Sequence, residues 1–128
     1  MTSSPKRDWP HKNLIAWQEA MELVRLIYIF ASELPSDEKF NVISQLKRAS
    51  VSIPLNIAEG AGRNTDKEFR HFLHIARGSL SEVNTILDLC VLLKFCKDNR
   101  IEILNGQEQK CAALINGLIK SIDRKHPS

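Results

Sequence analysis

Apolar residues recur at steps of three and four over four separate stretches of this chain, and no other feature restricts its fold as strongly. In the first stretch they stand at Trp17, Met21, Val24, Ile27, Tyr28, Ala31 and Leu34. This spacing places the side chains on one face of an α-helix. β-branched residues never alternate with polar ones over a length that would predict a strand. The repeat therefore predicts an all-α protein.

Signals that start and stop helices divide the chain at the same places. Leu34 precedes Pro35, and the first helix should end there because a residue before proline is disfavoured in the helical conformation. Thr65 and Glu68 form a capping box at the start of the third helix. The other predicted caps are Asn13, Ser36 and Asn99 at helix starts, with Gly60 and Gly62 as the stop of the second helix. We expect helices over about residues 14–34, 37–61, 66–96 and 100–123.

The later helices carry apolar stripes as well. The stripe of the second helix comprises Phe40, Ile43, Leu46, Ala49, Ile53 and Ile57. The stripes of the third and fourth helices include Cys90 and Cys111, which we expect to be core residues. Because the connections are short, neighbouring helices should be antiparallel, as in an up-down-up-down four-helix bundle. We predict this bundle over residues 13–124, after a flexible polar and basic tail (1–12) and before a short tail (125–128).

The composition fits a single globular domain in a reducing compartment. The chain has 128 residues, of which 43% are hydrophobic, and this is enough for one core but not for two. Its three cysteines show no regular spacing, which excludes a disulfide framework. No apolar run is long enough to span a membrane, and the N-terminus lacks the apolar segment of a secretory signal. We therefore expect a cytoplasmic protein with no membrane contact.

Two of the predicted helices have more apolar surface than one bundle core can cover. Beside its main stripe, the first helix carries a second apolar set, which comprises Leu23, Leu26, Ile29 and Phe30. Residues 86–95 of the third helix are apolar nearly all round. Helices that are apolar on more than one side are covered on more than one side, and large apolar patches are rare on soluble monomers. We predict a homo-oligomer.

The excess of positive charge lies in the two ends of the sequence. The whole chain has a formal net charge of +3. Residues 1–12 and 120–128 together hold six Lys and Arg against two Asp, so the body between them is close to neutral. A protein that binds nucleic acid usually shows a basic face. Any such binding here would therefore need a local patch of cations.

A polar stripe follows the second helix. Its members are separated by three or four residues and are Gln45, Arg48, Ser52, Asn56, Glu59 and Arg63. These steps keep all six side chains on one helix face. In one interpretation the stripe is solvated or forms an internal network, with its arginines paired to Glu59 or Glu82. In the other it lines a ligand groove, with arginines for phosphates and amides for base edges. Residue chemistry leaves both interpretations open.

The run QLKRASVSIPLNIAEGAGR (residues 45–63) resembles the signature of the four-helix-bundle proteins, which are also called ribosomal RNA intervening-sequence proteins. WQEAMELV (17–24) and KEFRHFLHIARGSLSE (67–82) resemble segments of the same family. The resemblance implies a four-helix bundle that assembles into a ring-like homopentamer. Genes of this family are often found inside intervening sequences of large-subunit ribosomal RNA. Related accessory proteins of diversity-generating retroelements bind nucleic acid and a reverse transcriptase.

The resemblance carries no catalytic residues with it, so we expect a protein that is not an enzyme and needs no cofactor. We expect a homo-oligomer, with a pentamer favoured, that binds RNA or DNA. The candidate nucleic-acid-binding residues are Arg48, Arg63, Lys67, Arg70 and Arg77. The alternative is a protein-interaction scaffold that binds no nucleic acid, in which the polar stripe only organises the bundle. The stripe residues that would do so are Gln45, Ser52, Asn56, Glu59 and Glu82.

One motif has the spacing of a metal site. Glu68 and His71 form a Glu-x-x-His, as used in di-iron bundles. Those sites need two such motifs and two further inward-facing glutamates, and this chain has one motif. We therefore expect no bound metal.

Overall fold

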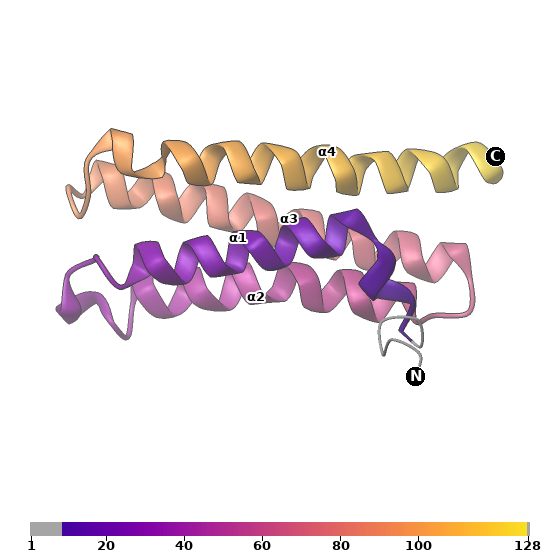
Figure 1. The fold of residues 1–128 in the computed structure, drawn as a ribbon, viewed down its shortest axis with the longest axis horizontal. Coiled ribbons are helices and arrows are strands. Elements are labelled where there is room, and N and C mark those ends of the chain that lie inside the picture. Colours follow the sequence, from indigo (N-terminus) through magenta and orange to yellow (C-terminus); the bar gives the residue numbers. More distant parts are fainter. Residues whose placement is uncertain (1–8, 128) are drawn as a thin grey trace, which may run out of the picture.

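The computed structural model describes residues 9–127, which fold into four α-helices joined by short segments (Figure 1). The α-helices are α1 (Ile15–Ala31), α2 (Val42–Ala61), α3 (Asp66–Leu92) and α4 (Glu102–Lys125). The short 3-10 helices η2 (Pro10–Asn13), η3 (Ser36–Glu38) and η4 (Asp98–Ile101) precede α1, α2 and α4. The described residues contain no strand. The predicted all-α fold is confirmed.

The four helices run in alternating directions along one long axis, as an up-down-up-down bundle (Figure 1). Each helix packs against its neighbours in sequence, and α4 closes the bundle against α1. Both ends of the described chain lie at one end of the bundle, beside the short turn between α2 and α3 (Figure 1). The opposite end, which we call the loop end, carries the connections α1–α2 and α3–α4 (residues 32–41 and 93–101).

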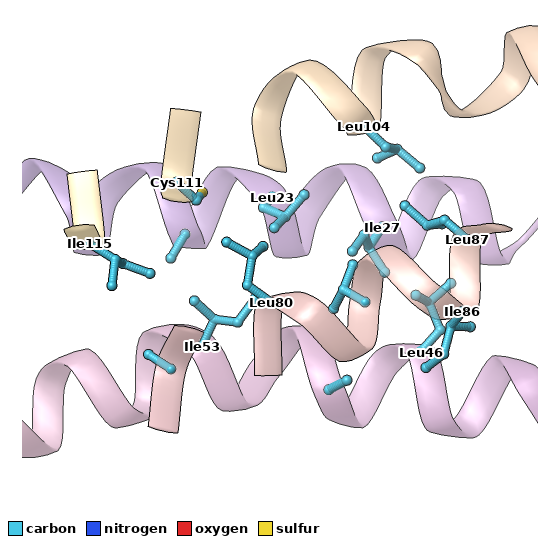
Figure 2. Close-up of a cluster of buried hydrophobic side chains, with 14 of the residues drawn as sticks. Leu23, Ile27, Leu46, Ile53, Leu80, Ile86, Leu87, Leu104, Cys111 and Ile115 are labelled. Carbon is cyan, nitrogen blue, oxygen red and sulfur yellow. The ribbon is translucent and has the colours of Figure 1, made fainter. Parts of the chain in front are cut away.

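The core lies along the centre of the bundle and is filled by aliphatic side chains from all four helices. Figure 2 labels Leu23, Ile27, Leu46, Ile53, Leu80, Ile86, Leu87, Leu104, Cys111 and Ile115 in this cluster. A fully buried Leu or Ile contributes roughly 1.5–3 kcal/mol through the hydrophobic effect. Cys90 and Cys111 are fully buried, as predicted, and burial raises the pKa of the Cys90 thiol to about 11 and that of Cys111 to about 12. Both thiols therefore behave as core groups.

The face of α1 that enters the core differs from the predicted main stripe. Met21 and Tyr28 were expected in the core, but they are 46% and 43% exposed. Leu23 and Phe30, assigned to the second apolar set, are buried instead. Both faces of this helix are apolar, and periodicity alone cannot choose between two apolar faces. The prediction of excess apolar surface on α1 is correct, but the core face takes residues from both sets, since Ile27 and Ala31 of the main stripe are buried and Ile29 of the second set is exposed.

The second helix begins later than predicted, and its first apolar residue is outside the core. Residues 36–38 form η3, and α2 starts only at Val42. Phe40 therefore precedes the helix, and its side chain is 86% exposed. The remaining predicted members of the stripe are buried: Ile43, Leu46, Ala49, Ile53 and Ile57.

The predicted helix caps have mixed outcomes. The capping box at α3 is confirmed, since the Glu68 backbone N–H donates to Thr65 Oγ1 at 3.1 Å. No side-chain cap is made by Asn13, Ser36 or Asn99, because a 3-10 turn leads into each of the other helices. Gly60 lies inside α2, and Gly62 follows its last residue.

The third helix ends at Leu92, a turn earlier than predicted. Lys94 adopts a left-handed backbone with φ of 63°, and the Phe95 N–H donates to the Cys90 carbonyl at 2.8 Å. The Lys94 N–H donates to the Val91 carbonyl at 3.0 Å. This is the helix-ending arrangement in which glycine is preferred at the left-handed position.

The N-terminal segment was predicted to be a flexible tail up to residue 12, but residues 10–13 form η2, which packs on α1 and α2. The His11 ring meets the Trp17 ring edge-on at 5.0 Å between centroids. Gln18 Nε2 donates to the Lys12 carbonyl at 2.9 Å. These contacts fix Lys12 at the same end of the bundle as the α2–α3 turn. Residues 1–8 of the predicted tail lie outside the described residues.

Candidate functional site

The centre of the polar stripe is an internal network between α2 and α3. The hydroxyls of Ser52 and Ser79 lie 2.9 Å apart, across the two helices. The Asn56 amide donates to the Ser52 carbonyl at 2.8 Å and to the Ser52 hydroxyl at 2.9 Å. These hydrogen bonds satisfy polar groups that the close packing of the two helices removes from water. At this point of the stripe the structure agrees with the network interpretation.

Gly60 explains how α2 and α3 come so close at one end. A Cβ at this position would lie 2.8 Å from Phe72 Cβ and 2.9 Å from Phe69 Cδ1. Both distances are shorter than van der Waals contact, so a side chain here would push α3 away. We predicted Gly60 as a helix stop, but its role in the structure is close helix packing.

Toward the loop end the stripe opens into a hollow of about 530 Å³, which we call the α2–α3 groove. It is lined by Phe40, Gln45, Arg48, Ala49, Ser52, Ser79 and Glu82. Arg48 Nη2 donates to Ser44 Oγ at 2.8 Å, and Arg48 has no ion pair among the described residues. Neither Gln45 nor Glu82 has a side-chain hydrogen bond among those residues. This part of the stripe has the unpaired polar groups that the groove interpretation requires.

At the opposite end of the stripe Arg63 is engaged with acidic residues. Its guanidinium lies 2.8 Å from the Glu59 carboxylate and 3.9 Å from the Glu68 carboxylate. It also lies over the Phe72 ring, 5.0 Å from the centroid. The pairing of Arg63 with Glu59 that the network interpretation proposed is therefore present.

An ion pair and a contact between a carboxylate and an imidazole join α3 to the C-terminal end of the chain. Arg70 Nε donates to Asp123 Oδ1 at 2.7 Å, and this hydrogen bond lowers the pKa of Asp123. His126 Nε2 lies 2.9 Å from Asp66 Oδ2, and this contact lowers the pKa of Asp66. Each pair spans more than fifty residues of sequence, so sequence spacing gives no sign of it.

These pairs leave a set of cations that have no carboxylate partner among the described residues. They are Lys12, Lys67, Lys120, Arg124 and Lys125, and we call them the basic end. They come from η2, the start of α3 and the end of α4, which lie at the end of the bundle that holds both chain termini (Figure 1). Of the candidate binding residues, Lys67 belongs to this set, and Arg63 and Arg70 lie beside it. The three α4 cations were not among the candidate residues.

Arg77 lies on the opposite side of α3 from Arg48. Its Nη1 donates to Asn116 Oδ1 of α4 at 2.9 Å, and its Nη2 lies 2.9 Å from His74 Nδ1. Burial, reinforced by the positive charge of Arg77, lowers the pKa of His74. The five candidate cations therefore do not form one patch, since Arg48 lies on α2 at the α2–α3 groove and Arg77 faces α4.

Sequence reasoning also missed a buried acid between α3 and α4. Glu108 is only 4% exposed, and its Oε1 accepts a hydrogen bond from Asn84 at 2.9 Å. Its other oxygen is buried without a partner, and burial raises the pKa of this carboxyl. Glu108 stands at an apolar position of the α4 repeat, between Leu104 and Cys111. An acidic residue at such a position is the sequence signal that could have revealed it.

Two further observations concern the chemistry available to the described residues. They contain no group of three His, Cys, Asp or Glu side chains arranged to hold a metal ion. None of the helices between residues 9 and 127 combines the length and the apolar character needed to cross a membrane.

Comparison with known proteins adds three findings. A family model described as 23S rRNA-intervening sequence protein matches residues 12–117. A crystal structure of a protein with unknown function from the S23 ribosomal protein family of Bacteroides thetaiotaomicron VPI-5482 is similar, with a TM-score of 0.76 and 22% identity. The similarity covers 83% of this chain and 99% of that chain, and at this identity it shows the fold alone. No curated protein matches this chain.

Proposed function

This chain belongs to the 23S rRNA-intervening sequence protein family, and we propose that it acts as a non-enzymatic homo-oligomer that binds RNA or DNA through its basic end. The observation that carries the proposal is the unequal pairing of charges there. The carboxylates of Glu59, Glu68 and Asp123 lie in ion pairs with arginines, and that of Asp66 contacts the His126 ring. The five cations of the basic end have no carboxylate partner within residues 9–127. Unpaired Lys and Arg side chains are the groups that bind nucleic-acid phosphates.

Oligomerisation is supported by an apolar strip on the outer face of α1 and α2. The strip comprises Met21, Tyr28, Val51 and Leu55, and Leu55 is 63% exposed. Three of these residues line a shallow hollow of about 370 Å³. A second copy that covers this strip would remove the exposed apolar surface from water. We propose that the copies form a ring of five, as the family resemblance implies.

A ring would also compensate for the small number of cations in each copy. Every copy brings one basic end, and linked sites bind a common partner more tightly than a single site. Avidity of this kind can exceed the single-site affinity by about 10²–10⁴-fold. The near-neutral body of the chain is therefore compatible with nucleic-acid binding by the assembly.

The assembly is tested by measuring the mass of the protein in solution with light scattering. We expect a particle several times heavier than the 14.6 kDa chain. Leu55→Glu places a charge in the apolar strip and should lower that mass. Ile103→Glu, at an exposed position of α4, is the matched control and should leave it unchanged. A parent protein that stays at 14.6 kDa would contradict the proposed oligomer.

Binding is tested by titrating a labelled RNA hairpin and the DNA duplex of the same length, with fluorescence anisotropy as the readout. Affinity for double-stranded nucleic acid should fall steeply with salt. For three phosphate contacts, a fourfold rise in salt lowers the affinity roughly 40-fold. Absence of binding at low salt would overturn the proposal.

The second candidate function is a protein-interaction scaffold that binds no nucleic acid. The observation that favours it is the engagement of Arg63 and Arg70 with carboxylates. Under this alternative the oligomer forms, but neither RNA nor DNA binds at low salt. The two measurements above therefore separate the two functions.

A further inference from the structure

The α2–α3 groove combines three kinds of group on one open hollow of about 530 Å³. Its floor is formed by small side chains, including the buried Ala49 and Ser79. Its walls carry a cation, an amide and a carboxylate, from Arg48, Gln45 and Glu82. The groove is large enough for a planar group with a few polar atoms, and the small side chains of its floor leave this space open. These features are those of a binding site rather than of a solvated helix face.

Phe40 supplies an aromatic surface at the rim of the groove. The ring is 86% exposed, although exposing the apolar area of a phenyl group to water is unfavourable in free energy. The Lys39 ammonium lies over the ring, 5.6 Å from its centroid. Aromatic side chains placed in this way stack on unpaired bases in proteins that bind single-stranded nucleic acid.

Gln45 and Glu82 line both the groove and a second hollow of about 360 Å³, and so stand between the two. The Glu82 carboxylate accepts hydrogen bonds but donates none. Its two oxygens therefore favour guanine, which presents two adjacent donors in its ring N–H and amino group, over uracil, whose single ring N–H lies between two carbonyls. The Gln45 amide both donates and accepts, and can complete the contact with the edge of the base.

We propose that the α2–α3 groove binds one unpaired guanine nucleotide of the bound strand. Phe40 stacks on the base, Glu82 and Gln45 contact its edge, and Arg48 binds the adjacent phosphate. The inference rests on the proposed function, because the nucleotide belongs to a strand that the basic end also holds. Gln45 and Ala61, the last residue of α2 beside the basic end, are 16 residues apart, which corresponds to about 24 Å along the helix. The strand therefore needs a single-stranded stretch of this length between the two sites.

The mononucleotides GMP and UMP test the groove without the contribution of the basic end. Both are titrated into the full-length oligomer, and amide chemical shifts are followed by NMR. We expect GMP to bind at least tenfold more tightly than UMP, with shifts centred on residues 45, 48, 79 and 82. Equal affinities, or shifts centred elsewhere, would overturn the inference.

Variants then assign the preference to particular groups. Glu82→Gln should remove the preference for GMP, and Phe40→Ala should weaken binding of both mononucleotides by an order of magnitude. Glu102→Gln, an exposed carboxylate at the start of α4, is the matched control and should change neither. Phe40→Ala is also examined by light scattering. A lower mass would show that another copy covers Phe40, and the inference would be wrong.

Oligonucleotides separate this inference from the proposed function. A ten-nucleotide uridine strand and the same strand with two central guanosines carry equal charge, so the basic end contacts them equally. We expect the guanosines to raise the affinity about tenfold, and Glu82→Gln to abolish that gain. Equal binding of both strands would overturn the groove but leave the basic end intact. Absence of binding to either strand and to the hairpin would overturn both.

Discussion

The two ends of the bundle use their charged residues differently. At the basic end, residues 59–70 and 119–127 hold six Lys and Arg against four Asp and Glu, so an excess of positive charge remains after the ion pairs of Arg63 and Arg70 are formed. At the loop end, residues 32–41 and 93–101 hold four Lys and Arg against four Asp and Glu, and Glu33 pairs with Arg100. The other acids there stand beside lysines, so their charges cancel. The comparison teaches that the local balance of cations and acids, and not the net charge of the whole chain, decides which sign of charge a surface offers to a partner.

The two ends also differ in packing. The basic end is closed by a four-residue turn, by the capping box at Thr65 and by the close contact of Gly60 with Phe72. The loop end has two 3-10 turns, the exposed Phe40 and the left-handed Lys94. A rigid basic end holds its cations in fixed positions, which favours a repeated site. The predictions below disturb one end or the other.

The largest effect on stability is expected from Gly60→Ala at the basic end. The new Cβ would lie 2.8 Å from Phe72 Cβ, which is held by the backbone of α3, so the two helices must separate. We expect a loss of about 1–3 kcal/mol in the free energy of unfolding, measured by urea denaturation. Gly78→Ala is the control, because nothing lies within 4 Å of its Cβ, and it should gain about 0.5–1 kcal/mol. Equal effects of the two substitutions would contradict the close contact.

The pH dependence of stability should differ between the basic end and the α3–α4 interior. The folded-state pKa of Glu108 is raised above 4.5. Its contribution to the free energy of unfolding is therefore fully present below pH 4.5 and is lost as pH rises through the folded pKa. The pKa values of Asp66 and Asp123 are lowered below 3.8, so their contribution is present above pH 3.8 and is lost as pH falls.

Glu108→Gln removes the first of these dependences. At pH 7 it should raise the free energy of unfolding by about 1 kcal/mol, because a buried carboxylate no longer has to ionise. The gain should vanish below pH 4.5, and thermal unfolding at pH 4 and pH 7 measures both values. A loss of stability at pH 7 would show that the ionised carboxylate is favourable in the bundle.

Thr65→Ala removes the N-cap of α3 at the basic end. The Glu68 N–H then loses its partner at the helix start. We expect a loss of about 1 kcal/mol in urea denaturation, and Thr65→Ser should restore most of it. An unchanged midpoint would mean that water replaces the hydroxyl without loss.

The smallest effect is expected at the loop end from Lys94→Gly. Lys94 has a φ of 63°, where a side chain is strained and glycine is not. We expect a gain of about 0.5–1 kcal/mol in the same assay. Lys97→Gly, at an extended position, should give no gain. A loss at Lys94 would show that its side chain makes a stabilising contact.

Sequence patterns predicted those parts of the fold that depend on neighbours along the chain. The period of three and four located all four helices, and Thr65 with Glu68 marked the start of α3 correctly. The same period could not choose between the two apolar faces of α1, so Met21 and Tyr28 were placed in the core. Phe40 was also predicted to be in the core. The structure places it outside, because η3 delays the start of α2.

The candidate site was predicted in outline only. The spacing of the polar stripe placed Ser52 and Asn56 on one face correctly, and the structure adds the partner, Ser79. The excess of positive charge in residues 1–12 and 120–128 indicated four cations of the basic end, but sequence alone could not show that they lie at the same end of the bundle as Lys67. The contacts Arg70–Asp123 and Asp66–His126 are invisible to sequence spacing, because each joins residues more than fifty positions apart.

The most direct test of the basic end is the affinity of the oligomer for the RNA hairpin, compared between two charge reversals. One is Lys120→Glu with Lys125→Glu at the basic end, and the other is Lys94→Glu with Lys97→Glu at the loop end. Both change the net charge equally. The account predicts that the first lowers low-salt affinity at least tenfold and reduces the salt slope by about two, while the second leaves the slope unchanged. Equal losses from the two variants would show that overall charge, and not the basic end, holds the nucleic acid.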